Sequence, residues 1–226
     1  MITIFKLNKE RHIIALLLSV TLLIIGFIFL IPTQPENNKN LRLPWLIEVN
    51  KQGDLTVFDI TLQQTTLAQA RFILQKEEEL TLFKKNKTYS LEAYFGRINL
   101  NGLKGDFILT LAVSSEQFKL FYQNGARMSK MGSGEYKITL SSQDFPTINQ
   151  LKIQYITYIP TKNLNHQMII GRFGQPQTKI KESETSLVHW LYPKKGLDIA
   201  VSEKGKEVLQ YFPPEQFKKV TNFNAY

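Results

Sequence analysis

Residues 79–113, ELTLFKKNKTYSLEAYFGRINLNGLKGDFILTLAV, contain three short stretches typical of β-strands, at 79–85, 89–96 and 106–113. Each stretch is rich in apolar or aromatic residues and is bounded by Asn, Gly or Lys. The short segments between these stretches are typical of strands that follow one another in an antiparallel meander. The stretch therefore predicts that an antiparallel sheet forms the centre of the domain.

A helix is predicted just before this meander. Thr66 and Gln69 have the spacing of a capping box, in which the two side chains bond each other's backbone amides. Leu67, Ala70, Ile73 and Leu74 then give one apolar face as far as about Gln75. Upstream, residues 43–50 and 55–62 predict a hairpin that opens the domain.

The middle of the chain continues with short elements. Ser114 predicts a second capped helix, which ends at Asn124-Gly125. Residues 135–140 and 152–160 predict strands, with a short helix near 143–149 between them.

The last third repeats the order of a helix followed by a meander. Residues 163–174 predict a helix that ends at Gly174, because Pro176 prevents its continuation. Three strands are predicted after it, at 185–193, 196–203 and 205–212. The two helix starts lie about 97 residues apart, which suggests a duplicated unit.

A membrane span is predicted near the N-terminus. Residues 13–31, IIALLLSVTLLIIGFIFLI, carry no charge, and nineteen residues at 1.5 Å each give roughly 28 Å, close to the thickness of a bilayer core. A cleaved signal peptide is the alternative, but the run is long for one and no small-x-small cleavage site follows it. Lys6, Lys9 and Arg11 precede the span, whereas no basic residue follows it before Lys39. This asymmetry favours a cytoplasmic N-terminus.

These patterns together predict an α+β protein in which a transmembrane helix precedes an ectodomain of two helix-plus-antiparallel-meander units. The predicted segments are a cytoplasmic stub (1–12), the span (13–31), a linker (32–43), a first unit (44–160), a second unit (161–212) and a tail (213–226).

Composition narrows the possible functions. The chain has no cysteine, which excludes disulfides, thiolate metal sites and a cysteine nucleophile. The net charge is +9, of which the stub supplies +2 and the rest of the chain +7. Such a surface attracts anionic headgroups or acidic proteins, but the basic residues are too scattered to indicate nucleic-acid binding. A solvated basic face is the simpler explanation.

Four groups of residues in the second unit carry a resemblance to a known family. They are Arg172-Phe173-Gly174-Gln175-Pro176, His189-Trp190-Leu191-Tyr192-Pro193, Leu197-Asp198-Ile199 and Gly205-Lys206-Glu207-Val208. The unit resembles the small outer-membrane-assembly lipoprotein family, small protein A, and its β-lactamase-inhibitor-protein-like fold. The resemblance implies a concave sheet that binds proteins, with no known chemistry of its own. This chain differs in having a predicted span in place of a lipidated cysteine.

The whole ectodomain also resembles proteobacterial single-pass inner-membrane proteins. The resemblance rests on Pro44-Trp45, Tyr192-Pro193 and Gly196-Leu197-Asp198-Ile199. It implies a bacterial inner-membrane location with the bulk of the chain in the periplasm. No activity comes with it.

Aromatic residues on the last strands are the best candidates for an interaction site. Trp190, Tyr192 and Tyr211 can share one sheet, and Trp and Tyr are common in binding hot spots. Core packing is the alternative, favoured for Trp190. We therefore name these three as possible protein-interaction residues.

No catalytic, cofactor-binding or metal-binding residues are predicted. His166 and His189 have no partner at ligand spacing, and we expect His189 to pack beside Trp190. Asp198 should point away from its apolar neighbours and bond a nearby turn. Glu77 to Glu79 are expected to form a solvated turn.

The sequence favours a membrane-anchored module, without catalytic activity or cofactor, that binds or assembles another cell-envelope protein. A receptor-like module for a small ligand, lipid or cell-wall fragment is the alternative. A hydrolase with an unrecognised site is a third possibility.

Overall fold

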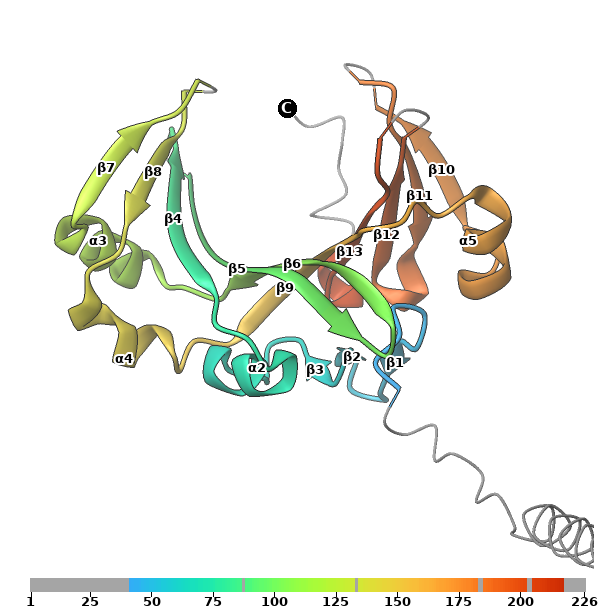
Figure 1. The fold of residues 1–226 in the computed structure, drawn as a ribbon, viewed down its shortest axis with the longest axis horizontal. Coiled ribbons are helices and arrows are strands. Elements are labelled where there is room, and N and C mark those ends of the chain that lie inside the picture. Colours follow the sequence, from blue (N-terminus) through green and yellow to red (C-terminus); the bar gives the residue numbers. More distant parts are fainter. Residues whose placement is uncertain (1–40, 87, 133, 183–184, 203–204, 218–226) are drawn as a thin grey trace, which may run out of the picture. The chain divides into compact units, whose positions relative to one another are not determined.

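The computed structural model describes residues 41–86, 88–132, 134–182, 185–202 and 205–217 (Figure 1). The predicted stub, span, linker residues 32–40 and tail residues 218–226 lie outside the described residues. From Leu41 onward the chain forms one compact unit. Within the described ranges, no helix is long and apolar enough to cross a membrane.

The fold is a mixed α/β fold dominated by antiparallel sheet. The α-helices of the described residues are α2 (Leu67–Leu74), α3 (Ser115–Asn124), α4 (Phe145–Ile148) and α5 (His166–Phe173). The same part of the chain contains the short 3-10 turns η2 (Ser142–Asp144), η3 (Pro193–Lys195) and η4 (Pro214–Gln216).

A small sheet of three strands contains β1 (Glu48–Val49), β2 (Leu55–Val57) and β3 (Ile60–Thr61). The main sheet of ten strands has the order β10 (Thr178–Lys181), β11 (Val188–Tyr192), β12 (Leu197–Val201), β13 (Val208–Tyr211), β9 (Ile153–Pro160), β6 (Leu103–Leu111), β5 (Thr88–Leu100), β4 (Glu79–Lys85), β8 (Tyr136–Thr139) and β7 (Arg127–Lys130).

The predicted meanders are both present and share this sheet. Strands β4, β5 and β6 pair in sequence order, and so do β10 to β13. Strand β9 pairs with β6 on one side and with β13 on the other, so it joins the strands of the two predicted units. The main sheet is therefore continuous across the predicted boundary at residue 160.

The sheet bends so that its two ends rise on the same side, and the helices lie on the other side (Figure 1). Helices α2 to α5 and the small sheet pack their apolar residues into one core with one face of the main sheet. Alternation along each strand places large side chains on that face. One cross-strand row of this core contains Trp190, Ile199, Leu209, Tyr158, Phe107 and Phe95.

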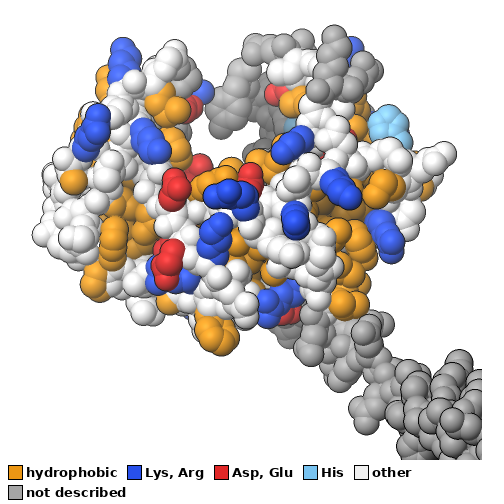
Figure 2. Space-filling model, in the orientation of Figure 1, with side chains coloured by type: hydrophobic (Ala, Val, Ile, Leu, Met, Phe, Trp, Pro, Cys, Tyr) orange, Lys and Arg blue, Asp and Glu red, His pale blue; other side chains and the backbone are white. Residues whose placement is uncertain are grey.

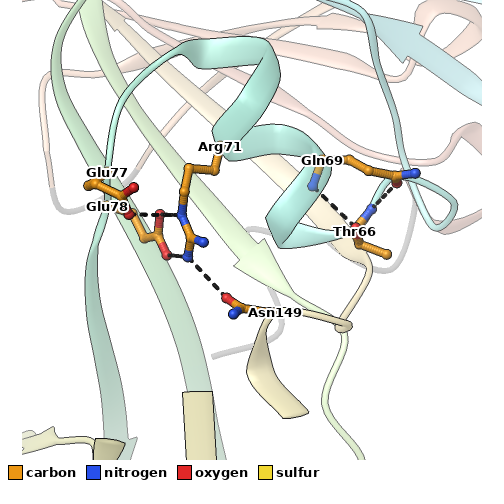
Figure 3. Close-up of polar contacts among 6 residues, drawn as sticks. All are labelled: Thr66, Gln69, Arg71, Glu77, Glu78 and Asn149. Carbon is orange, nitrogen blue, oxygen red and sulfur yellow. Dashed lines mark hydrogen bonds and ion pairs between the residues drawn. The ribbon is translucent and has the colours of Figure 1, made fainter. Parts of the chain in front are cut away.

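Both predicted capping boxes are confirmed. Thr66 and Gln69 exchange two hydrogen bonds at the start of α2 (Figure 3). Ser114 and Gln117 do the same for α3. These bonds satisfy amide groups that the first turn of a helix otherwise leaves unpaired.

The expectation of a solvated glutamate turn after α2 is wrong for Glu78. Its side chain is only 3 % exposed and pairs with the Arg71 guanidinium, which also donates to Asn149 over 3.0 Å (Figure 3). This pairing raises the pKa of Arg71, chiefly through the hydrogen bond to Glu78. Glu77 is exposed, as expected, and also contacts Arg71 at 2.9 Å. One arginine therefore ties α2 to the start of β4.

Two turns depart from the predicted strands. The predicted strand 55–62 is broken at Phe58 and Asp59, which both have positive φ and connect β2 to β3. Strand β5 runs on to Leu100, and Asn101 and Gly102 form the turn to β6, both with positive φ. Such backbone angles suit tight hairpins. Strands β7 and β10, the two edges of the sheet, were not predicted.

Candidate functional site

The face of the main sheet opposite the helices carries a row of side chains that crosses eight strands. We call it the concave face and define it by this row, which contains Thr178, Leu191, Asp198, Gln210, Thr157, Ile108, Tyr94 and Glu79. The space-filling view is hollowed between the two raised ends of the sheet (Figure 2). No α-helix among the described residues packs on this face.

The concave face differs in character from the core face of the same strands. Along β6, for example, Phe107 and Leu109 are buried, whereas Ile108 and Thr110 between them are half-buried. Along β9, Thr157 and Ile159 are likewise half-buried on the concave side. The middle of the concave face is therefore a partly exposed surface of apolar, hydroxyl and aromatic groups.

Tyr94 is the exposed aromatic residue in this middle region. Its side chain is 38 % exposed, and its ring lies over Gly96, where an added Cβ would be 2.8 Å from the phenol oxygen. Removal from water, aided by the nearby Asp106 carboxylate, raises the pKa of Tyr94. The glycine thus leaves room for the tyrosine ring against the sheet.

The end of the concave face near β4 and β8 is more strongly charged. Lys85 lies 3.4 Å from Glu135, and the Ser90 hydroxyl donates to Glu92 over 2.8 Å. A depression of about 360 Å³ lies here, with Phe83 as its main apolar residue. Charges of both signs surround it, so this end can contact polar groups of a partner.

The opposite end of the concave face is covered by residues 213–217 of the predicted tail. Phe217 is buried in a small cluster with Leu191 and Phe212, and Tyr155 and Ile180 pack against it. The Tyr155 hydroxyl donates to the Gln216 side chain over 3.0 Å. The first part of the tail is therefore docked on the sheet.

A buried histidine and aspartate lie beside this cluster. His189 Nδ1 is 2.7 Å from Asp198 Oδ2, and both side chains are almost fully buried. Burial raises the pKa of Asp198, and the contact with His189 opposes part of that rise. As expected, His189 lies beside Trp190 on a strand, β11, and the two side chains point to opposite faces of it. His166 packs against Trp190, at 5.0 Å between ring centres. Asp198 does point away from its apolar neighbours, but it bonds His189 rather than a turn.

The three predicted interaction residues all lie in the core rather than on the concave face. Trp190 and Tyr192 are 2 % and 5 % exposed beneath α5, and Tyr211 is completely buried. Tyr192 donates to the Gly174 carbonyl over 3.0 Å, and Tyr211 donates to the Pro44 carbonyl over 2.9 Å. Burial raises the pKa of Tyr192 to about 12. This placement favours the core-packing alternative, extended from Trp190 to all three.

Sequence reasoning missed the residues that do line the concave face. Tyr94, Ile108 and Thr157 sit on three central strands, and their common row depends on the register of β5, β6 and β9. Alternation alone showed that each strand has two faces. It did not show which strands would be neighbours.

Cation–aromatic contacts fix the helix α5 end of the sheet. Lys179 lies 3.6 Å from the Trp190 ring centre, and Arg172 lies 4.6 Å from that of Trp45. Elsewhere on the visible face, Lys and Arg are spread rather than gathered (Figure 2). At the other end of the sheet, Lys84 lies 4.2 Å from the Tyr122 ring centre, so basic side chains pack on aromatic rings at both ends.

Comparisons with family models, curated proteins and solved structures gave no match. Among the described residues, no group of three or more His, Asp or Glu side chains converges as a metal site would require. The site is therefore described by its own geometry.

Proposed function

We propose that this protein is a bacterial single-pass inner-membrane protein whose periplasmic α+β domain binds another envelope protein on its concave face. The domain consists of two helix-plus-meander units in this proposal, and residues 13–31 anchor it with the N-terminus in the cytoplasm. The protein acts by assembly or scaffolding, without a cofactor or catalytic activity.

The observation that carries this proposal is the row of residues that crosses the concave face. Its middle members, Thr157, Ile108 and Tyr94, are partly exposed although they lie on central strands of the sheet. Protein interfaces combine an apolar and aromatic centre with a polar rim. Here Ile108 and Tyr94 supply the centre, and Lys85 and Glu135 lie toward one end.

The edges of the sheet support binding through this face rather than by strand addition. The edge strands β7 and β10 read RMSK and TKIK, and each carries two basic residues. Charged residues on an edge strand oppose pairing with another chain. A partner is thus better accommodated across the sheet than along its edge.

Binding of a small ligand at the concave face receives less support from the depression found there. The depression near Phe83 is open to solvent and lined by charges of both signs, whereas ligand pockets are concave and mostly apolar. We therefore favour a protein partner.

The test is affinity purification of the full-length protein from crosslinked native membranes, followed by mass spectrometry. The Ile108→Arg variant places a charge in the middle of the concave face, and Leu120→Arg on α3 is a control at a 48 % exposed apolar residue outside that face. A fragment of residues 1–45 controls for proteins held by the anchor alone.

We expect wild type and Leu120→Arg to recover the same stoichiometric protein and Ile108→Arg to lose it. Equal recovery by Ile108→Arg would contradict binding at the concave face. If no variant recovers a specific protein, the scaffold proposal fails, and small ligands, lipids and cell-wall fragments become the candidates.

A further inference from the structure

The most exposed large hydrophobic side chain of the described residues is Phe72 on helix α2. It is 84 % exposed, whereas the other exposed large apolar residues reach at most 49 %. Its helix neighbours Ala70 and Leu74 are buried in the core, so Phe72 occupies the solvent-facing side of a helix that is otherwise well packed. Removing this ring from water would be favourable.

Phe72 lies next to the place where the chain enters the described unit. Arg42, the second described residue, donates from Nη1 to the carbonyl oxygen of Ile73 over 2.7 Å. Its Nε also pairs with Asp59 at 2.6 Å, and its backbone amide donates to Asn101 over 2.7 Å. One of these bonds ties the entry of the chain to α2, and the other two tie it to the β2–β3 and β5–β6 turns.

The predicted tether is short compared with the domain that follows it. Residues 32–40 number nine, and a fully extended chain of that length reaches at most roughly 30 Å. A flexible chain of that length has an average span of about 17 Å, similar to the radius of gyration of about 16 Å expected for a compact unit of this size. If residues 13–31 span the bilayer, as proposed, a tether of this length limits how far Leu41 can lie from the membrane.

The charges around Phe72 do not oppose contact with anionic headgroups. The carboxylates of Asp59, Glu77 and Glu78 are each paired with an arginine. Lys76, one turn after Phe72, is exposed and donates to a backbone carbonyl. Hydrophobic side chains are visible over α2 in the space-filling view (Figure 2). Phe72 is thus an apolar side chain among uncharged glutamines, such as Gln69 and Gln75, and the nearby carboxylates are held in ion pairs.

We propose that Phe72 and the surrounding surface of α2 dock on the lipid bilayer, with the ring inserted at the interface between headgroups and acyl chains. Helices that lie at that interface bury Trp, Phe and Leu side chains in it. The proposal rests on the predicted span at 13–31 and on the short tether, but not on a partner at the concave face. Docking here would turn the side that carries α2 toward the membrane and leave the concave face directed away from it.

The absence of cysteine from the chain makes a direct test possible. Phe72→Cys in the full-length protein provides one unique site for a nitroxide label, and Met128→Cys on β7, 46 % exposed in the native protein, provides a matched control. Both proteins are reconstituted in vesicles of phosphatidylethanolamine and phosphatidylglycerol. Electron paramagnetic resonance then compares collisions of each label with lipid-soluble oxygen and with a water-soluble nickel chelate.

We expect the label at position 72 to favour oxygen and the label at 128 to favour the nickel chelate. Equal access of the nickel chelate at both positions would overturn the proposal. So would a label at 72 that is water-accessible in vesicles but protected in native membranes, because that result assigns Phe72 to a protein partner.

A second variant guards against an effect of the label itself. Phe72→Trp should show extra fluorescence quenching by brominated lipids relative to wild type, in which Trp45 and Trp190 provide the background. Phe72→Ser should show only the wild-type background. Absence of extra quenching in Phe72→Trp would contradict insertion of the ring.

Discussion

Removal of the Tyr211 hydroxyl should destabilise the domain although it deletes a single atom. Tyr211 is completely buried, and its hydroxyl donates to the carbonyl oxygen of Pro44 over 2.9 Å. The two residues are 167 positions apart in the chain, so this bond ties β13 to the segment that precedes the small sheet. Tyr211→Phe leaves the buried carbonyl without this donor.

The expected loss follows from the cost of an unpaired buried acceptor. That cost is about 1–3 kcal/mol, more than the net value of an ordinary hydrogen bond. A loss of about 2 kcal/mol in the free energy of unfolding corresponds to a decrease in Tm of about 4–8 °C for a domain of this size. The ring itself stays, together with its edge contact to Phe58 at 5.7 Å between centres.

Thermal and urea unfolding of the full-length protein in detergent measures this loss. Trp45 is adjacent to Pro44 and packs on Phe173 at 6.3 Å, so its fluorescence reports on the affected region. Tyr155→Phe is the matched control, because the Tyr155 hydroxyl is half-buried and solvent can replace its bond to Gln216. An unfolding free energy of Tyr211→Phe within about 0.5 kcal/mol of wild type, or an equal loss in Tyr155→Phe, would refute the reasoning.

Three further substitutions have definite expected outcomes. Arg71→Ala should lower the unfolding free energy by about 3 kcal/mol, since the nearly buried Glu78 carboxylate loses its cation. In urea unfolding, the double variant Arg71→Ala with Glu78→Gln should lose less than the sum of the two single losses. Gly105→Ala should cost about 1–3 kcal/mol by the same measurement, because the new Cβ would overlap the Tyr158 ring. Asp198→Asn should become more stable relative to wild type as pH rises, as measured by urea midpoints at several pH values.

The sign of the Asp198 prediction follows from the direction of its pKa. Burial raises the folded-state pKa above the ordinary value of 3.8, so the folded protein holds this proton more tightly than the unfolded chain does. The associated stability is fully present below the unfolded pKa and is lost as pH rises through the folded pKa. Asparagine has no proton to lose there. A difference between variant and wild type that does not change with pH would contradict this assignment.

The predictions for Gly105→Ala and Arg71→Ala have their own controls. Gly132→Ala adds a Cβ with no heavy atom within 4 Å, so it should leave stability nearly unchanged. If it lowers stability as much as Gly105→Ala does, overlap is not the cause. Additive losses for the Arg71 and Glu78 substitutions would mean that the ion pair contributes no coupling energy.

Local signals in the sequence predicted the helices well, because each signal acts within a few residues. The capping boxes at Thr66 and Ser114 require only a hydroxyl and a glutamine three positions later, and both are formed as predicted. The meander of β4, β5 and β6 also follows from short-range breaks between apolar stretches. Its long hairpin at Asn101-Gly102 could have been predicted from the same kind of signal, since Asn-Gly is a strong indicator of a tight turn.

The concave face was less predictable because it depends on long-range pairing. All the residues of β11 from His189 to Tyr192 are buried, so the pattern of this strand does not distinguish its core face from the other face. Strand alternation puts Trp190 and Tyr192 on one side and Leu191 on the other, as in the structure. It did not indicate that α5 covers that side, or that Phe217 and Phe212 cover the side of Leu191.

The main sheet separates two surfaces that differ in chemistry and, in our proposals, in partner. Phe72 belongs to α2 on the helix-covered side, near the entry of the chain at Leu41, whereas Ile108 belongs to the concave face. Because packed β-strands and the core lie between them, a substitution at one surface has no shared contact through which to disturb the other. A substitution at Ile108 should therefore reduce partner recovery without changing lipid contact, and a substitution at Phe72 should do the reverse. Each proposal can thus be refuted without the other.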